Sequence, residues 1–186
     1  LSHQPVVSRR FTRSAVGLPA DAVVLACFNN IYKITPALFA CWLRILGRTR
    51  DTVLWLLDDN EWATAALRGH AQAAGLPADR LFFSGRATHA DYREKLALAD
   101  IYLDSYPYNA GSTARDVLDA RVPLVTLAGR TPVSRMAGGM LQAAGLDDLV
   151  ATTWEGYEQL VIDLATDPAR RSAVTATIDA RADEWR

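Results

Sequence analysis

Apolar runs separated by helix-like segments repeat along this chain. Residues 22–28 and 52–57 are nearly continuous in Val, Leu, Ala and Trp, without the apolar–polar alternation of a strand that has one wet face. Such runs predict β-strands that are covered on both faces, as in a parallel sheet. Shorter apolar runs predict four further strands, at residues 80–84, 99–103, 123–127 and 149–151.

The segments between these strands carry the start and stop signals of helices. Thr35 followed by Pro36 is a cap and first turn, and apolar residues then recur at helical spacing to about Arg48. Asn60 is placed to cap a helix that reaches about Ala74, before Gly75 ends it. The same reasoning predicts helices at about residues 88–98, 113–120, 133–144, 154–165 and 168–185.

Strand–helix alternation of this kind predicts an α/β fold, a Rossmann-like parallel sheet in three layers with right-handed crossovers. Ligands of such sheets bind beyond the carboxyl ends of the strands. That rule brings four loops to one edge, and lets the loops at 85–89 and 106–113 face the first one across a crevice. The four loops are residues 29–33, 58–60, 85–89 and 106–113.

Composition limits the class of protein. The chain has 186 residues, half of them hydrophobic and 22% charged, so we expect one globular domain at residues 21–186 after a lead-in at 1–20. A formal net charge of −1 and the lack of a basic block argue against nucleic acid binding. Cys27 and Cys41 lie in apolar segments without ligand spacing, so we expect two free core thiols and neither a disulfide nor a zinc site.

Targeting signals are missing from the printed sequence. No apolar run is long enough to span a bilayer, and residues 1–5 lack the features of a signal peptide, so we expect a cytoplasmic protein without membrane contact. The sequence begins without Met and ends in a helical pattern at Trp185–Arg186. We therefore expect a piece of a longer polypeptide.

One junction between strand and helix offers chemistry. The small residues Gly111, Ser112 and Thr113 follow the apolar run at 99–103 and begin a helix, where backbone N–H groups and the helix dipole favour an anion. The alternative is an ordinary cap, in which Ser112 or Thr113 satisfies the first turn. Lys33, on a loop of the same edge, is expected either to face that anion or to be a solvated loop lysine.

Two other polar residues leave alternatives open. Asp116, one turn into the same helix, either favours the helix dipole or accepts the two hydroxyls of a ribose. His89 stands at the start of a helix and is a weaker candidate for a site residue.

Five sequence words resemble, in order and spacing, the catalytic C-terminal half of the O-linked N-acetylglucosamine transferases and their SPINDLY-like relatives. The resemblance covers nearly the whole chain and implies the C-terminal lobe of a GT-B glycosyltransferase, from a bacterial homologue. The five words are FNNIYKI at 28–34, VLWLL at 53–57, GLPADRL at 75–81, LADIYLD at 98–104 and STARDVL at 112–118.

The resemblance implies roles at the diphosphate end of a nucleotide-sugar site. Lys33 matches the family lysine that contacts the β-phosphate and is expected to stabilise the leaving diphosphate. Asn30 stands where the family usually has Gln, and Ser112 and Thr113 match its paired threonines at the phosphates. The site is expected to include the whole loop from Asn109, with Gly111 at the position of a family histidine.

The resemblance also implies the nucleoside end of that site. Asp116 matches the carboxylate on the uridine ribose, and Ala87 matches a backbone contact to uracil. Tyr92 stands at a base-stacking histidine, Lys95 at an arginine near the base, and His89 at another family lysine. Tyrosine can replace histidine in base stacking. The changes at His89 and Lys95 leave open UDP or GDP as the nucleotide, and Gly111 leaves the donor sugar open.

The implied activity is inverting, metal-independent transfer of N-acetylglucosamine from UDP-GlcNAc to Ser or Thr hydroxyls of proteins, with no cofactor. The acceptor-activating groups, the other lobe and tetratricopeptide repeats are expected N-terminal to this chain, so the chain alone is expected to bind nucleotide weakly and transfer nothing. Two alternatives stay open. One is a related lobe that uses another donor such as GDP-fucose, and the other is a non-enzymatic Rossmann-like interaction domain.

Overall fold

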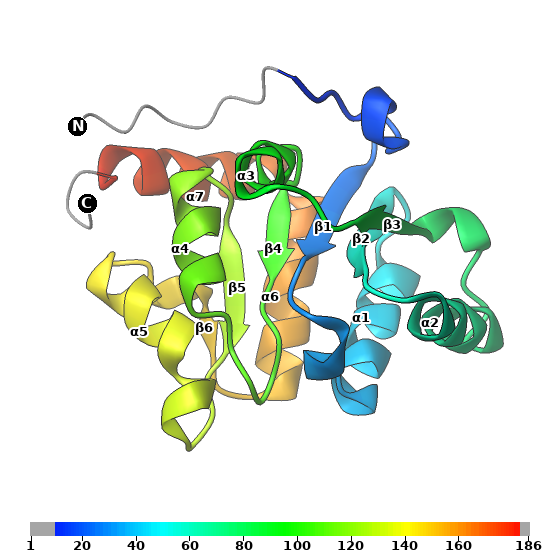
Figure 1. The fold of residues 1–186 in the computed structure, drawn as a ribbon. Coiled ribbons are helices and arrows are strands. Elements are labelled where there is room, and N and C mark those ends of the chain that lie inside the picture. Colours follow the sequence, from blue (N-terminus) through cyan, green and yellow to red (C-terminus); the bar gives the residue numbers. More distant parts are fainter. Residues whose placement is uncertain (1–9, 183–186) are drawn as a thin grey trace.

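A computed structural model describes residues 10–182 and shows a six-stranded parallel sheet between two layers of helices (Figure 1). The strand order is β3-β2-β1-β4-β5-β6, so the direction of strand addition reverses between β1 and β4. The strands are β1 (Val23–Cys27), β2 (Thr52–Asp58), β3 (Leu81–Gly85), β4 (Ile101–Leu103), β5 (Leu124–Leu127) and β6 (Val150–Ala151).

The helices divide between the two faces of the sheet (Figure 1). One layer holds α1 (Pro36–Arg48), α2 (Glu61–Ala73) and α6 (Trp154–Thr166), and α7 (Pro168–Ala180) packs on α6. The other layer holds α3 (His89–Leu96), α4 (Ser112–Asp119) and α5 (Met136–Ala143). Short 3-10 helices lie in the connections, namely η1 (Ser14–Val16), η2 (Ile31–Lys33), η3 (Ala78–Arg80), η4 (Pro132–Ser134) and η5 (Asp147–Leu149).

Local signals explain where the first helices begin and end. The Thr35 hydroxyl accepts the Leu38 N–H at 3.3 Å, directly before Pro36 opens α1. The Asn60 side chain accepts the N–H of Ala63 at the start of α2 in the same way. These bonds satisfy donors that the helix itself leaves unpaired, so the predicted caps are confirmed.

Large aromatic side chains form the core beside the central strands. Trp42 of α1 donates its indole N–H to the Tyr157 hydroxyl of α6 at 3.1 Å, and both residues are fully buried. Tyr102 of β4 is fully buried as well, and its hydroxyl oxygen accepts the Phe28 N–H at 3.0 Å, directly after the end of β1. These hydrogen bonds pair the polar atoms of Trp42, Tyr157 and Tyr102, and the last one holds the ends of β1 and β4 together.

Cys27 and Cys41 are both buried and free, as expected for core thiols. Burial raises the pKa of the Cys27 thiol to about 12 and that of Cys41 to about 11. Neither thiol is therefore ionised near neutral pH.

Two predictions about helices differ from the structure. The helix expected at 133–144 is divided, because the Ser134 hydroxyl donates to the Thr131 carbonyl and accepts the Thr131 N–H, which closes η4 before α5 begins. The cap of α4 is Gly111, so neither Ser112 nor Thr113 is the ordinary side-chain cap considered as an alternative.

Parts of the predicted ends lie outside the described residues, namely 1–9 of the lead-in and 183–186 of the last helix. Within residues 10–182, no helix has both the length and the apolar character needed to cross a bilayer.

Candidate functional site

A polar cavity of about 380 Å³ lies beyond the carboxyl ends of β1 and β4, where the strand order reverses. Residues after β1 form one side of it and the start of α4 forms the other. Asn30, Lys33, Gly111, Ser112 and Thr113, all expected at the diphosphate, line this cavity together. Its remaining lining residues are Phe28, Asn29, Tyr108 and Met136.

Lys33 is the positive charge of this cavity, and η2 positions it. Its ammonium nitrogen lies 4.1 Å from the centroid of the Tyr108 ring, which is a cation–π contact. On the opposite side, the first turn of α4 has no side-chain cap because Gly111 has no side chain to supply one. A lysine and an uncapped helix start therefore meet across one cavity, an arrangement that favours an anion.

Buried hydrogen bonds join the loop after β1 to the loop after β4. The Asn29 amide donates to the Ser105 hydroxyl at 2.8 Å, and that hydroxyl donates to the Tyr108 carbonyl at 2.6 Å. Both Asn29 and Ser105 are buried. The position of Tyr108, and with it the contact to Lys33, therefore depends on a residue of β1's own loop.

Asp104 holds the same loop from inside the protein. One carboxyl oxygen accepts the N–H groups of Ser105 at 2.8 Å and Ala110 at 2.7 Å, and the other accepts the Thr126 hydroxyl at 2.6 Å. Burial raises the pKa of this carboxyl to about 7, although the three hydrogen bonds and the charge of Lys33 oppose that rise. Asp104 closes residues 105–110 into a turn directly before α4.

A second cavity of about 320 Å³ adjoins the first, and Phe28 lines both. Ala87, His89, Tyr92 and Lys95, the residues expected at the base, all line it. The other lining residues are Leu57, Ser84, Gly85 and Arg86. Two flat rings stand in this cavity at a small angle, His89 and Tyr92, with centroids 6.1 Å apart and planes at 30°.

The position of the Tyr92 ring is set by its packing on other aromatic side chains. Its ring also meets Phe28 edge to face, with centroids 6.1 Å apart, and Phe28 in turn packs edge to face on the buried Trp55 at 4.7 Å. Burial raises the pKa of the Tyr92 hydroxyl, which therefore stays protonated. The cavity thus presents a rigid aromatic wall, the kind of surface on which a planar base stacks.

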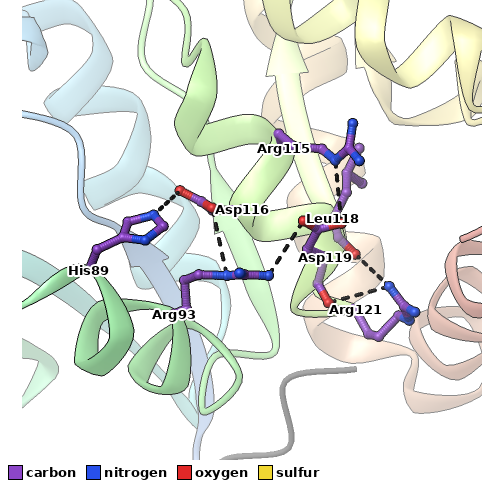
Figure 2. Close-up of polar contacts among 7 residues, drawn as sticks. All are labelled: His89, Arg93, Arg115, Asp116, Leu118, Asp119 and Arg121. Atoms are coloured by element: carbon purple, nitrogen blue, oxygen red, sulfur yellow. Dashed lines mark hydrogen bonds and ion pairs between the residues drawn. The ribbon is translucent and has the colours of Figure 1, made fainter. Parts of the chain in front are cut away.

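Asp116 projects from α4 toward α3, where two basic side chains meet it (Figure 2). His89 Nε2 lies 3.3 Å from one carboxylate oxygen, and Arg93 Nε lies 3.7 Å from the other. Arg93 also donates to Asp119 at 3.4 Å, so one guanidinium spans both acids of α4. Asp116 is thereby held by two residues of α3, one of which, His89, lines the second cavity.

Further polar contacts of Asp119 and of Arg121 stabilise the C-terminal end of α4 (Figure 2). Arg115 Nε contacts Asp119 at 3.4 Å, four residues along the helix. Arg121 donates to the carbonyls of Leu118 and Asp119, both at 3.3 Å, which satisfies acceptors at the end of the helix.

Two predicted site residues line neither cavity. One is Asp116, which contacts His89 of the second cavity without lining it. The other is Asn109. It is fully buried, and its amide donates to the Ser105 carbonyl at 2.8 Å. The side chain of Asn109 shapes the loop from within, whereas its neighbours Gly111 to Thr113 line the cavity.

Eight lining residues were not among the predicted site residues: Phe28, Asn29, Leu57, Ser84, Gly85, Arg86, Tyr108 and Met136. Phe28 and Tyr108 lie inside the sequence words and loops already singled out, so their place at strand ends was a usable signal. Arg86 lies in the predicted loop at 85–89, but its partners are distant in sequence. No feature of the sequence indicated Met136, because it begins α5 and lies outside the four loops expected at the site.

Comparisons with a family model and with individual proteins place this chain in the same family. The model described as glycosyl transferase family 41 matches residues 3–184. An Arabidopsis thaliana protein named "Probable UDP-N-acetylglucosamine-peptide N-acetylglucosaminyltransferase SEC" is 34% identical over 169 residues, which are 90% of this chain and 17% of that protein. A Caenorhabditis elegans UDP-N-acetylglucosamine-peptide N-acetylglucosaminyltransferase is 33% identical over 156 residues, 84% of this chain and 14% of that protein. The chain therefore spans less than a fifth of either relative.

Solved structures share the fold. A mutant O-GlcNAc transferase of Thermobaculum terrenum superposes with a TM-score of 0.84 at 23% identity, over 96% of this chain and 35% of that one. The C-terminal domain of a group 1 glycosyl transferase from Francisella tularensis has a TM-score of 0.70 at 10% identity, over 98% of this chain and 96% of that domain. The expected architecture, the C-terminal lobe of a GT-B fold, is confirmed.

Proposed function

Because this chain belongs to glycosyl transferase family 41, we propose that its two adjoining cavities bind the nucleotide part of a UDP-sugar donor. One observation supports this above all: Lys33 and the uncapped start of α4 line the same cavity. In this arrangement the base occupies the cavity of Tyr92, Asp116 accepts ribose hydroxyls, and the diphosphate lies between Lys33 and Ser112–Thr113. The relatives named for peptide N-acetylglucosaminyl transfer support UDP-GlcNAc as the donor.

The proposed reaction is a single displacement with inversion. A Ser or Thr hydroxyl of an acceptor protein attacks the anomeric carbon while the bond from that carbon to the β-phosphate oxygen breaks. The hydroxyl proton passes to a group outside this chain, and UDP leaves with the negative charge that develops. Lys33 and the N–H groups of α4 stabilise this charge more in the transition state than in the ground state, without a metal ion or other cofactor.

The remaining parts of the proposed enzyme are a preceding lobe and protein-presenting repeats, since the relatives are several times longer than this chain. Nucleic acid and membrane have no part in the proposed reaction, and we propose the cytoplasm as its compartment.

Lys33→Ala in the natural full-length protein tests this function. We expect glycosyl transfer to a peptide acceptor to fall about 10²- to 10³-fold in kcat, the range for loss of one preorganised electrostatic contact. Arg50→Ala is the matched control, because it removes a positive charge from an exposed residue at the opposite edge of the sheet, before β2. Unchanged turnover in Lys33→Ala would contradict a leaving-group role.

Calorimetric titration with UDP and GDP tests the donor. The proposal expects UDP to bind more tightly than GDP. Preference for GDP would assign the lobe to a GDP-sugar transferase, and binding of neither nucleotide would favour an interaction domain that has lost donor binding.

A further inference from the structure

Arg86 lies on the boundary of the two cavities and contacts two other loops. Its Nη2 donates to the Asp59 carboxylate at 2.6 Å and to the Asn30 side-chain carbonyl at 2.8 Å, and its Nε donates to the same Asp59 oxygen at 3.1 Å. Arg86 itself lines the base cavity, whereas Asn30 lines the diphosphate cavity. One side chain thus connects the two halves of the proposed nucleotide site.

The three residues follow three adjacent strands. Asn30 comes after β1, Asp59 after β2 and Arg86 after β3, and these strands lie side by side in the sheet. Asp59 is the partly buried anchor, with 20% of its side chain exposed against 63% for Arg86. The Asp59 carboxylate holds the Arg86 guanidinium in place, and the guanidinium also donates to the Asn30 side-chain carbonyl.

The hydrogen bond to Asn30 decides which end of its amide is left for a ligand. A side-chain amide has one carbonyl oxygen, which accepts, and one NH₂ group, which donates twice. Because Arg86 donates to the carbonyl oxygen, the NH₂ group remains for the polar cavity that Asn30 lines. A diphosphate offers acceptors alone, so only this orientation of the amide suits it.

We propose that Arg86 is a positioning residue of the nucleotide site: it fixes the Asn30 amide with its NH₂ group toward the diphosphate. This inference rests on the proposed function. Arg86 acts through Asn30, and Asp59 acts through Arg86. Arginine suits the role because its planar fork holds Asp59 with two nitrogens while one of them also serves Asn30, which a lysine ammonium on a flexible stem does not reproduce.

A double-mutant cycle on the natural full-length protein, with UDP and uridine as calorimetric probes, tests the proposal. We expect Arg86→Gln to weaken UDP binding about tenfold and uridine binding less than twofold, because uridine lacks the diphosphate. Asn30→Ala is expected to weaken UDP to a similar degree. In the Asn30→Ala background, Arg86→Gln is then expected to add less than a twofold loss, since the amide that it positions is gone.

Arg86→Lys separates positioning from charge. Lysine keeps the positive charge but lacks the planar fork that holds Asn30. We therefore expect Arg86→Lys to weaken UDP binding nearly as much as Arg86→Gln does. UDP affinity retained in Arg86→Lys would overturn the proposal in favour of simple charge attraction. An equal loss of UDP and uridine, or a full loss from Arg86→Gln in the Asn30→Ala background, would overturn it in favour of a structural role for the loop.

Lys33→Ala distinguishes failure of this inference from failure of the proposed function. If Lys33→Ala weakens UDP binding while Arg86→Gln does not, the nucleotide site stands and the role of Arg86 is overturned. If the unaltered protein binds no UDP, both are overturned.

Discussion

The ammonium group of Lys33 lies over the ring of Tyr108, 4.1 Å from its centroid. Tyr108 is 47% exposed and is held by its backbone carbonyl, which accepts the Ser105 hydroxyl. The ring therefore supports the lysine without neutralising its charge, as a carboxylate would. The Lys33 side chain thus lines the polar cavity where the diphosphate is proposed to bind.

Tyr108→Leu is expected to weaken UDP binding about two- to fivefold, because an exposed cation–π contact contributes about 0.5–1 kcal/mol. Tyr108→Phe keeps the ring face and is the matched control, with an expected change of less than twofold. Calorimetric titration with UDP measures both variants. Equal losses in the two would point to the hydroxyl rather than to the ring.

Asp104→Asn is expected to change how stability depends on pH. In the folded chain burial raises the pKa of this carboxyl to about 7 from an ordinary value of 3.8, so between these values the folded state binds more protons than the unfolded state. This carboxyl therefore lowers the free energy of unfolding as the pH rises from about 4 to about 7, by about 1 kcal/mol per pH unit. Asparagine still accepts the two N–H groups and has no such titration.

Urea unfolding at several pH values measures this difference. Relative to the unaltered protein, Asp104→Asn should gain stability steadily across that window. Parallel pH profiles for the two proteins would contradict a raised pKa at Asp104. Asp104→Ala, which removes the acceptors of Ser105 and Ala110, is expected to destabilise at every pH.

Asp116→Asn is expected to weaken UDP binding about tenfold, since a hydrogen bond to a charged acceptor contributes about 1.5–3 kcal/mol. Asp119→Asn is the matched control. It removes a carboxylate from the same helix that contacts Arg93 and Arg115, whereas Asp116 contacts His89, a lining residue of the second cavity. A nucleotide without the two ribose hydroxyls provides the second measurement. It should bind Asp116→Asn and the unaltered protein with similar affinity.

Gly111 and Met136 are expected to be energetically coupled. A Cβ atom added at Gly111 would lie 2.8 Å from the terminal methyl group of Met136, which occupies the space beside the start of α4. Gly111→Ala should therefore destabilise the protein by about 1 kcal/mol more in the presence of Met136 than in a Met136→Ala background. Urea midpoints of the four proteins measure the coupling, and additive effects would contradict it.

The elements of this fold were predictable where short-range chemistry decides them. Thr35 and Pro36 mark the start of α1, and the apolar run at 22–28 contains β1, because caps and continuous burial depend on neighbouring residues. The division of the helix expected at 133–144 was not predictable in this way. It depends on the buried Ser134 hydroxyl, and nothing in the apolar pattern distinguishes that residue from a helical serine.

The candidate site was likewise predictable only in part. The loops at the carboxyl edge followed from topology, and the resemblance named residues that the two cavities do bring together. The contact of Arg86 with Asn30 and the closeness of Met136 to Gly111 join residues 56 and 25 positions apart, and no local pattern indicates either. Asn109 shows the converse, because its place in a site loop did not reveal that its side chain turns inward.

Phe28 has one further consequence as the shared wall of the two cavities. Its backbone is tied to Tyr102 and its ring rests on Trp55, so the interval between the two cavities is set by the interior of the sheet. Substitutions that exchange individual contacts on the surrounding loops are therefore expected to leave the spacing of the two cavities unchanged.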